Sequence, residues 1–419
     1  MKNTIKSSIR LIAALIVAVM LMTSMTSCFF LDFDFNFDEF FDENLNPNPD
    51  GNLPGNPDSG NQGGDTGETD EELTFIPSNG ATANDASALN QALLSTVTVE
   101  APFTNGTSYG SGVIYQLDSN LGSAYIITNC HVVYYGDEGY CENINVYLYG
   151  MELQRYAVKA TVLGGSITYD LAVLKVTDSE ILKNAVCAKA TLGCSEDLKV
   201  FDTTYIIGNP ILQGLSVTKG ILSKTSEYIN LLGGDDTVIN VRVARTDATI
   251  NSGNSGGGMF DEQGRLVGIA TAISSRTDAH SIGYAIPIDL VKNVVENIID
   301  NYNGSNISGV KRVLMGVTIT ALTMGVQVDK ETGDIKKVEM VEIQSVNADS
   351  LIADKVQKGD IITSLTVGGT TVNPTQVYHV IDHMLTARNG DMVELMLDRN
   401  GETIRATFVV QPSNITAVK

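Results

Sequence analysis

The chain contains no tryptophan among its 419 residues, and aromatic residues make up only 6% of it. Positive charge is also scarce, because 27 lysines and arginines stand against 49 acidic residues and leave a formal net charge of −22. Duplex nucleic acid is therefore a poor partner, since binding it requires clustered cations that displace its counterions. The 39 glycines and the few aromatic residues favour a turn-rich, mainly β protein over a helical one.

The N-terminal apolar run is too short to cross a membrane comfortably. Residues 11–22 are twelve apolar residues, whereas a spanning helix needs about 20. The run follows a basic start and precedes a short polar segment, which is the layout of an export signal over residues 1–28. We therefore expect the body of the protein to lie outside the cytoplasm, in the cell envelope.

The end of this signal resembles a bacterial lipobox, in which a cysteine is lipidated and becomes the new N-terminus. The matching residues are Met25-Thr26-Ser27-Cys28, although Met25 stands where Leu is usual. The resemblance implies lipidation of Cys28 and a membrane anchor. Ordinary cleavage of the signal and an uncleaved anchor are the alternatives.

Residues 29–73 lack positive charge altogether. The segment holds thirteen acidic residues and no lysine or arginine, and it is rich in Gly, Pro and Asn. Low hydrophobicity and like charge cannot offset the entropy of ordering, so we predict a disordered, extended spacer. Its alternating Phe33, Phe35 and Phe37 leave open a contact with the membrane interface or a partner.

Cysteine is rare, with four residues besides Cys28, namely Cys130, Cys141, Cys187 and Cys194. An exported chain can oxidise them, and proximity in sequence favours pairing the first two and the last two. Free buried thiols remain the alternative. Because no second cluster of Cys and His has ligand spacing, we predict no metal site, and nothing in the sequence calls for a cofactor.

The order of apolar runs indicates two folded domains. Between residues 89 and 299, short apolar runs of five to eight residues alternate with Gly, Asn and Asp, which predicts a sandwich or barrel of strands. Helical spacing over residues 287–299 closes a domain that we place at 74–300. A polar linker at 301–309 follows, and the last hundred residues form a small α+β unit.

Three constellations on this β background carry chemistry. They are Thr-Asn-Cys-His-Val-Val around His131, Tyr-Asp-Leu-Ala-Val-Leu around Asp170, and Asn-Ser-Gly-Asn-Ser-Gly-Gly around Ser255. A serine hydroxyl becomes nucleophilic when an imidazole takes its proton, and a buried carboxylate fixes that imidazole in the right tautomer. Each residue alone is compatible with a structural role. Together, in this order and in an exported chain, they predict a catalytic triad.

The glycine-rich turn also supplies the donors that acyl transfer requires. The N–H groups of Gly253 and Ser255 are the natural pair to stabilise negative charge on a carbonyl oxygen. Glycine at position 253 permits backbone angles that a side chain would forbid.

Residues 109–300 resemble the protease domain of the HtrA/DegP family. The resemblance is carried by Gly-Ser-Gly-Val-Ile from residue 110, by the motifs at His131 and Asp170, by Ile-Gly-Asn-Pro from residue 207, and by Gly-Tyr-Ala-Ile-Pro from residue 283. It implies two packed six-stranded β-barrels of the trypsin fold, with the triad in the cleft between them. It also implies a homotrimer and cleavage of unfolded or misfolded proteins.

Residues 310–412 resemble the family's PDZ domain, a small α+β domain that binds peptide C-termini. Residues 312–317 resemble its carboxylate-binding loop and first strand, and residues 374–387 its groove helix. The implied peptide-binding residues are Leu314, Met315, Gly316, Val317, Val380 and Met384. Plain core packing is the alternative for any one of these side chains.

The resemblance further implies a shallow apolar specificity pocket walled by Ile250 and Ile273. Such a pocket offers no charge partner to Arg or Lys, so we expect cleavage after small or medium aliphatic residues. Packing of the barrel is the alternative role for both isoleucines. Two other functions stay open for the whole chain: a non-cleaving holdase or peptide-sensing module, and a site-specific signalling protease.

Overall fold

The computed structural model describes residues 73–76, 80–210, 213–273 and 282–419, with only the backbone at residues 272 and 273. The export signal, Cys28 and the acidic spacer up to residue 72 lie outside the described residues. Among the helices that the structure describes, none is long and apolar enough to cross a membrane.

Six antiparallel strands close into a first barrel in the order β7-β6-β1-β2-β3-β8, and β8 pairs back onto β7. The strands are β1 (Thr96–Phe103), β2 (Gly106–Asp118), β3 (Ser123–Thr128), β6 (Ile144–Leu148), β7 (Val158–Ser166) and β8 (Leu171–Val176). Successive residues of a strand point to opposite faces, and the inward face here carries branched apolar side chains such as Val99, Ile114 and Leu174.

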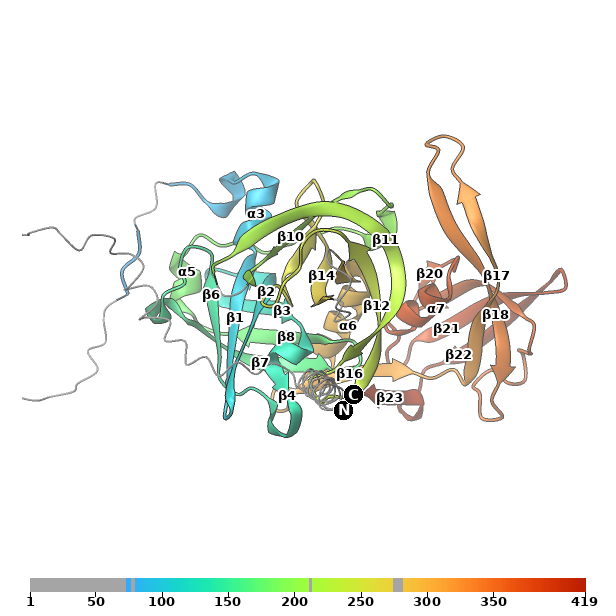
Figure 1. Ribbon diagram of the computed structural model, residues 1–419. Coiled ribbons are helices and arrows are strands. Elements are labelled where there is room, and N and C mark those ends of the chain that lie inside the picture. The colour runs from blue at the N-terminus through green and yellow to red at the C-terminus, as the bar shows by residue number, and fades with distance from the viewer. Residues whose placement is uncertain (1–72, 77–79, 211–212, 274–281) are drawn as a thin grey trace, which may run out of the picture. The chain divides into compact units, whose positions relative to one another are not determined.

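A second barrel follows the same plan in the order β13-β10-β11-β12-β15-β14, closed by pairing of β13 with β14. The strands are β10 (Thr203–Gly208), β11 (Ser216–Leu232), β12 (Val238–Thr246), β13 (Gly258–Phe260), β14 (Arg265–Ile273) and β15 (Gly283–Pro287). Ile206, Leu222, Met259 and Val267 pack in one of its buried clusters. The predicted double six-stranded barrel is confirmed (Figure 1).

The prediction that strands run for five to eight residues is wrong for β2 and β11, which have 13 and 17 residues. The pairing of β11 with β12 shifts register twice between Leu222 and Glu227. Such bulges bend a strand and increase its twist, so one long strand can continue around a barrel.

The helices of the double-barrel domain are few and short. They are α3 (Ala88–Leu94), α4 (Cys130–Val133), α5 (Glu180–Asn184) and α6 (Ile288–Asp300). The helix predicted over residues 287–299 is confirmed as α6, which Pro287 precedes as the N-cap. Its apolar stripe, including Val291, Val294 and Ile298, is buried against the barrels. Three short strands complete the domain: β4 (Tyr134–Tyr135), β5 (Gly139–Tyr140) and β9 (Thr191–Leu192).

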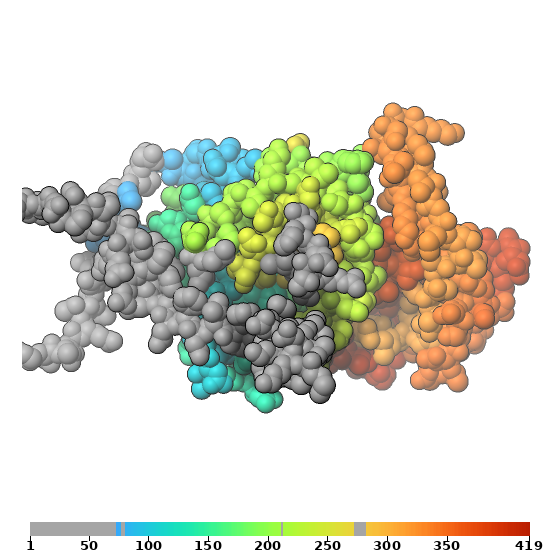
Figure 2. Space-filling view, viewed as in Figure 1, coloured from blue at the N-terminus to red at the C-terminus, as the bar shows by residue number. Residues whose placement is uncertain are grey.

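The C-terminal α+β domain is a sheet in the order β17-β18-β19-β21-β22, with β20 paired to β19. Its elements are β17 (Val317–Val328), β18 (Ile335–Val346), β19 (Ile361–Val367), β20 (Thr370–Val372), α7 (Val377–Met384), β21 (Met392–Arg399) and β22 (Glu402–Val409). The sheet and α7 enclose a separate core that includes Ile343, Leu365, Val380 and Leu395. The β17–β18 hairpin projects from the surface of this domain (Figures 1 and 2).

Two strands attach this domain to the first barrel. β16 (Ser308–Val313) pairs in parallel with β7 and antiparallel with β23 (Ile415–Val418). β16 therefore begins inside the segment that we expected to be linker at 301–309. The groove helix expected over residues 374–387 is shorter, because α7 begins at Val377 and ends at Met384.

Candidate active site

His131 and Asp170 come from two paired strands of the first barrel. β3 ends at Thr128 and leads into the one-turn helix α4, which carries His131, while Asp170 directly precedes β8. The His131 Nδ1 atom lies 3.0 Å from both carboxylate oxygens of Asp170, and the His131 amide donates to Oδ1 at 3.1 Å. This geometry fixes the imidazole so that Nε2 is the nitrogen available to accept a proton.

Asp170 is only 2% exposed and is held by two further donors. The Asn129 side-chain amide donates to its carbonyl oxygen at 2.8 Å, and the Thr271 hydroxyl donates to Oδ2 at 2.5 Å. The backbone of Asp170 has a φ of 50°, in the left-handed region that Asp tolerates better than most residues. The surrounding contacts hold this uncommon conformation and point the carboxylate at His131.

The charge state of His131 follows from this contact. Burial lowers the pKa of the imidazole, but the negative charge of Asp170 and its hydrogen bond outweigh burial and hold the pKa above the usual 6.5. His131 is neutral, and able to take a proton from a serine, only above that raised pKa.

Ser255 lies in the turn between β12 and β13, close to helix α4. Gly110 packs between the Val132 side chain and the carbonyl oxygen of Ser255, and a Cβ at Gly110 would lie within 3 Å of both. The Ser255 hydroxyl donates to the carbonyl oxygen of Thr271 at 3.3 Å, and no hydrogen bond within the described residues joins it to His131. The hydroxyl must therefore exchange this carbonyl for the imidazole before it can act as a nucleophile.

Ser111 of β2 holds the nucleophile turn in place. Its amide donates to the carbonyl of Ser255 at 2.8 Å, and its hydroxyl donates to the carbonyl of Gly253 at 2.7 Å. Gly256 has a φ of 85°, and a Cβ there would lie 2.1 Å from the Ser111 carbonyl, so only glycine fits. The turn is thus pinned to the first barrel through its backbone.

The two amides predicted to stabilise an oxyanion are those of Gly253 and Ser255. Gly253 has a φ of 97°, which glycine adopts at little cost. In the part of the chain that the structure describes, neither amide donates to a backbone carbonyl. Both therefore remain available to a developing negative charge.

The structure describes one of the two predicted specificity residues. Ile250 is 5% exposed and packs in the second barrel, where a Cβ at Gly283 would lie 2.7 Å from its Cδ1 atom. The side chain of Ile273 lies outside the described residues, and its backbone pairs with Gly283 on β15. Gly283 is therefore a neighbour of both residues: it lies against the Ile250 side chain and pairs with the Ile273 backbone.

Sequence reasoning missed the roles of Ser111 and Thr271. Ser111 stands in a motif that carried the family resemblance, but its contacts with residues 253 and 255 cross between the barrels and leave no periodic signal. Thr271 is one apolar-flanked residue near the C-terminal end of β14. Only the packing of β14 beside the Asp170 turn reveals that its hydroxyl reaches the Asp170 carboxylate.

The four cysteines of the folded part are free thiols. Cys130, beside His131, is fully buried, and its sulfur lies 3.7 Å from the Tyr140 hydroxyl. Burial, with a smaller contribution from Asp170, raises the pKa of this thiol to about 12. Reactivity requires the thiolate, so the Cys130 thiol is unreactive at neutral pH although it stands beside His131. No cluster with metal-ligating character occurs among the described residues.

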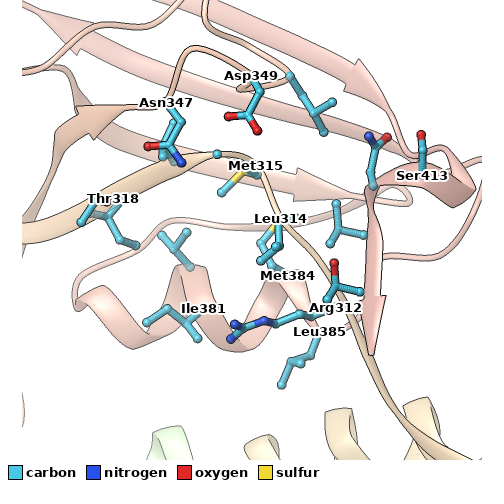
Figure 3. Close-up of a pocket in the computed structure, with 18 of the residues that line it drawn as sticks. Arg312, Leu314, Met315, Thr318, Asn347, Asp349, Ile381, Met384, Leu385 and Ser413 are labelled. Carbon is cyan, nitrogen blue, oxygen red and sulfur yellow. The ribbon is translucent and has the colours of Figure 1, made fainter. Parts of the chain in front are cut away.

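The six predicted peptide-binding residues all line one groove of about 580 Å³ in the C-terminal domain. The groove lies between α7 and the loop that joins β16 to β17, and its lining includes Leu314, Met315 and Met384 (Figure 3). β17 is the edge strand of its sheet, so its outer backbone groups have no neighbouring strand. An edge strand beside an apolar groove can accept an extended peptide as an added strand.

Comparison with known proteins agrees with this geometry. Residues 110–269 match a trypsin-like peptidase domain. The chain is 36% identical over 214 residues to serine protease Do-like HtrA of Bacillus subtilis, which covers 50% of this chain and 43% of the relative. It is 33% identical over 308 residues to a probable periplasmic serine endoprotease, DegP-like, of Halomonas elongata, covering 72% of this chain and 56% of the relative. Each match thus spans less than two thirds of the relative's length.

A solved structure extends the similarity to the C-terminal domain. The HtrA-type protease AlgW with a tripeptide has 28% sequence identity and a TM-score of 0.51, and the match covers 79% of this chain and 97% of the other. The two barrels, the paired His131 and Asp170 and the pinned nucleophile turn thus belong to a trypsin-like peptidase domain, and the chain is similar to HtrA/DegP serine proteases.

Proposed function

We propose that the chain is a serine endopeptidase that cleaves unfolded or misfolded proteins outside the cytoplasm. The observation that carries the proposal is the contact of His131 with Asp170 beside a nucleophile turn pinned by Ser111. The similar proteins are named serine proteases or endoproteases, and one of them is described as periplasmic. An export signal is in accord with that location.

In this mechanism the Ser255 hydroxyl gives its proton to His131 Nε2 as its oxygen attacks the scissile carbonyl carbon. Asp170 stabilises the imidazolium that forms, while the amides of Gly253 and Ser255 bind the oxyanion. His131 then gives the proton to the leaving amine, and water repeats the sequence to release the acyl group.

The substrate preference that we propose is for small or medium aliphatic residues before the cut. Ile250 closes one side of the pocket with a buried branched side chain, and neither position 249 nor 250 is acidic. A cationic side chain would have to lose its hydration without gaining a partner.

The direct test is hydrolysis of unfolded casein by the purified protein. Alanine at Ser255 or His131 should each lower turnover by several orders of magnitude and to a similar extent, because the triad acts as a unit. Alanine at Asp170 should also remove most turnover. If Ser255→Ala retains activity within tenfold of the unmodified chain, the nucleophile is a different group.

We further propose that the C-terminal domain is a PDZ domain that binds peptide C-termini and regulates or targets the protease. The open edge of β17 and the apolar groove beside α7 support this role. The similar AlgW protease was solved with a tripeptide. The arrangement of Ser255, whose hydroxyl rests on Thr271, favours an enzyme whose activity is regulated.

Two other functions are compatible with a Ser255 hydroxyl that is bonded to Thr271. A holdase or peptide-sensing module would protect unfolded clients equally well after Ser255→Ala, whereas a protease of unfolded proteins loses its effect on them. A site-specific signalling protease would cleave one member of a panel of unfolded proteins and leave the others intact.

A further inference from the structure

The peptide groove is built from both domains. Eighteen of its nineteen lining residues lie between positions 312 and 416, and the remaining one is Tyr169 of the protease domain. Tyr169 immediately precedes Asp170 and packs against the main buried cluster of the barrels. The groove wall therefore includes the neighbour of a triad residue.

The groove contains two side-chain donors that interact with each other. Arg312 and Tyr169 both line the groove, and the Arg312 charge acts on the Tyr169 phenol, whose pKa burial raises and Arg312 lowers. The phenol is therefore protonated at neutral pH and can donate. Arg312 is exposed and forms no ion pair with a carboxylate of any described residue. A guanidinium and a phenol side by side suit an anionic ligand group.

The neighbouring loop adds backbone donors. The Leu314 amide donates to the carbonyl of Asn414, whereas the amides of Met315 and Gly316 donate to no carbonyl within the described residues. Asp349, an acidic residue of the lining, lies across the groove from Arg312 (Figure 3). Negative charge on a ligand is therefore favoured at the Arg312 side and disfavoured at the Asp349 side.

We propose that Tyr169 of the protease domain is part of the peptide-binding site, where its hydroxyl and Arg312 together receive the C-terminal carboxylate of the ligand. This inference rests on the proposed peptide-binding function of the C-terminal domain. A bound peptide then touches the turn that carries Asp170 directly. The binding site is complete only when both domains are docked.

The proposal is tested by removing the Tyr169 hydroxyl and the peptide carboxylate, each alone and both together, and comparing the binding affinities. The mature chain carrying Ser255→Ala is titrated with a panel of short fluorescent peptides that end in Val, Leu, Phe or Ala. Each peptide is used with a free C-terminal carboxylate and as the C-terminal amide. Tyr169→Phe removes only the hydroxyl and keeps the ring that packs on the core. Tyr149→Phe, at an exposed tyrosine of the protease domain, is the matched control.

We expect Tyr169→Phe to weaken binding of the carboxylate peptides about tenfold or more, since hydrogen bonds to charged groups are stronger than those between neutral groups. The same variant should change binding of the amide peptides less than twofold, and Tyr149→Phe should change neither. A loss of general structure at Tyr169 would weaken both peptide forms equally, and that result overturns the proposal. Unchanged affinity for both forms overturns it as well.

The peptide-binding function itself has a separate signature. If no peptide of the panel binds the Ser255→Ala chain in either form, the proposed role of the C-terminal domain is wrong, and the role of Tyr169 falls with it. If peptides bind but Tyr169→Phe leaves their affinity unchanged, only the present inference fails.

Discussion

Thr271 contacts both ends of the triad. Its hydroxyl donates to the Asp170 carboxylate at 2.5 Å, and its carbonyl accepts the Ser255 hydroxyl at 3.3 Å. The first contact orients the acid for His131, while the second holds the nucleophile away from it. A displacement of β14 at this residue would therefore change the contacts of the Ser255 hydroxyl and of the Asp170 carboxylate together. In this structure the Ser255 hydroxyl thus has the Thr271 carbonyl as its partner in place of His131.

The pH dependence of activity follows from the contact of Asp170 with His131. Asp170 raises the pKa of His131, and activity should fall as the pH drops through that raised value, because the protonated imidazole cannot accept a proton. Asp170→Asn removes the negative charge, so the acid limb of the rate profile should move to lower pH. Turnover at the optimum should fall by roughly 10³ to 10⁴.

Rates of peptide hydrolysis across pH 5 to 9 measure both effects. Glu402→Gln, which neutralises an exposed carboxylate of the C-terminal sheet, should leave the profile unchanged. An acid limb that stays at the same pH in Asp170→Asn would show that a different group sets it.

Ile250 should determine the size of the residue accepted before the cut. Ile250→Ala shortens a buried wall, so cleavage should spread from Val, Ile and Ala toward Leu and Phe. The change in preference should be about 10- to 200-fold for side chains that differ by a methylene group. Mass-spectrometric mapping of cleavage sites in unfolded casein measures it.

Ile250→Val is the matched control, because it removes one methyl group and should broaden the preference only slightly. The alanine variant should also be less stable by about 2 to 5 kcal/mol, since Ile250 packs in the core. If the cleavage map is unchanged in Ile250→Ala while stability falls, Ile250 packs the barrel and walls no pocket.

At the scale of elements, helix α7 presents different residues to two neighbours. Val380, Ile381 and Met384 line the peptide groove. Tyr378 and Asp382, one turn apart, face the protease, where Arg242 of β12 pairs with Asp382 and stacks over the Tyr378 ring at 4.1 Å. The helix thus both forms the groove and docks the C-terminal domain.

The ion pair of Arg242 with Asp382 should anchor that docking. The Arg242 side chain is 3% exposed and that of Asp382 is 14% exposed, so removal of one partner leaves a buried charge. Burial raises the pKa of Asp382, and the Arg242 charge acts against this shift. Arg242→Ala should lower the free energy of unfolding by about 3 to 5 kcal/mol.

Urea denaturation and limited proteolysis between the domains measure the effect. Arg405→Ala, which breaks an exposed pair with Glu394, should cost at most about 1 kcal/mol. Replacing both Arg242 and Asp382 by apolar residues should recover most of the loss. Equal stability of Arg242→Ala and Arg405→Ala would contradict an anchoring role.

The sequence predicts elements better than it predicts their contacts. The apolar run after Asp170 locates β8, and helical spacing locates α6 to within one residue at each end. The 17-residue β11 was not foreseen, because bulges place polar residues inside it and interrupt the apolar pattern. The linker expected at 301–309 includes the first two residues of β16, Ser308 and Gly309. These small residues give no apolar strand pattern, although they pair with glycines of β7.

For the whole molecule, the motifs around His131, Asp170 and Ser255 predict the double barrel and the acid–histidine contact because chemistry constrains those residues directly. The link between the groove and the catalytic turn could not be predicted in this way. Tyr169 and Arg312 are 143 positions apart, and only the docking of the two domains brings them into one groove. A ligand contact of this kind is a property of the assembled chain, not of either domain's motif.

Attachment to the membrane is the last property that belongs to the whole chain, and Cys28 should decide it. If Cys28 is lipidated, the protein should sediment with membranes, whereas Cys28→Ser, once processed and released, should be soluble. The contrast should be large, because one acyl chain binds a membrane reversibly and two or more bind it firmly.

Cys187→Ser, at a buried thiol of the folded part, should fractionate like the unmodified chain. Fractionation followed by detection of the protein measures both variants, and labelling with a fatty-acid analogue tests the modification itself. If Cys28→Ser and the unmodified chain distribute identically, ordinary cleavage of the signal or an uncleaved anchor replaces lipidation. The distribution then separates these two, since a cleaved chain is soluble and an anchored one is not.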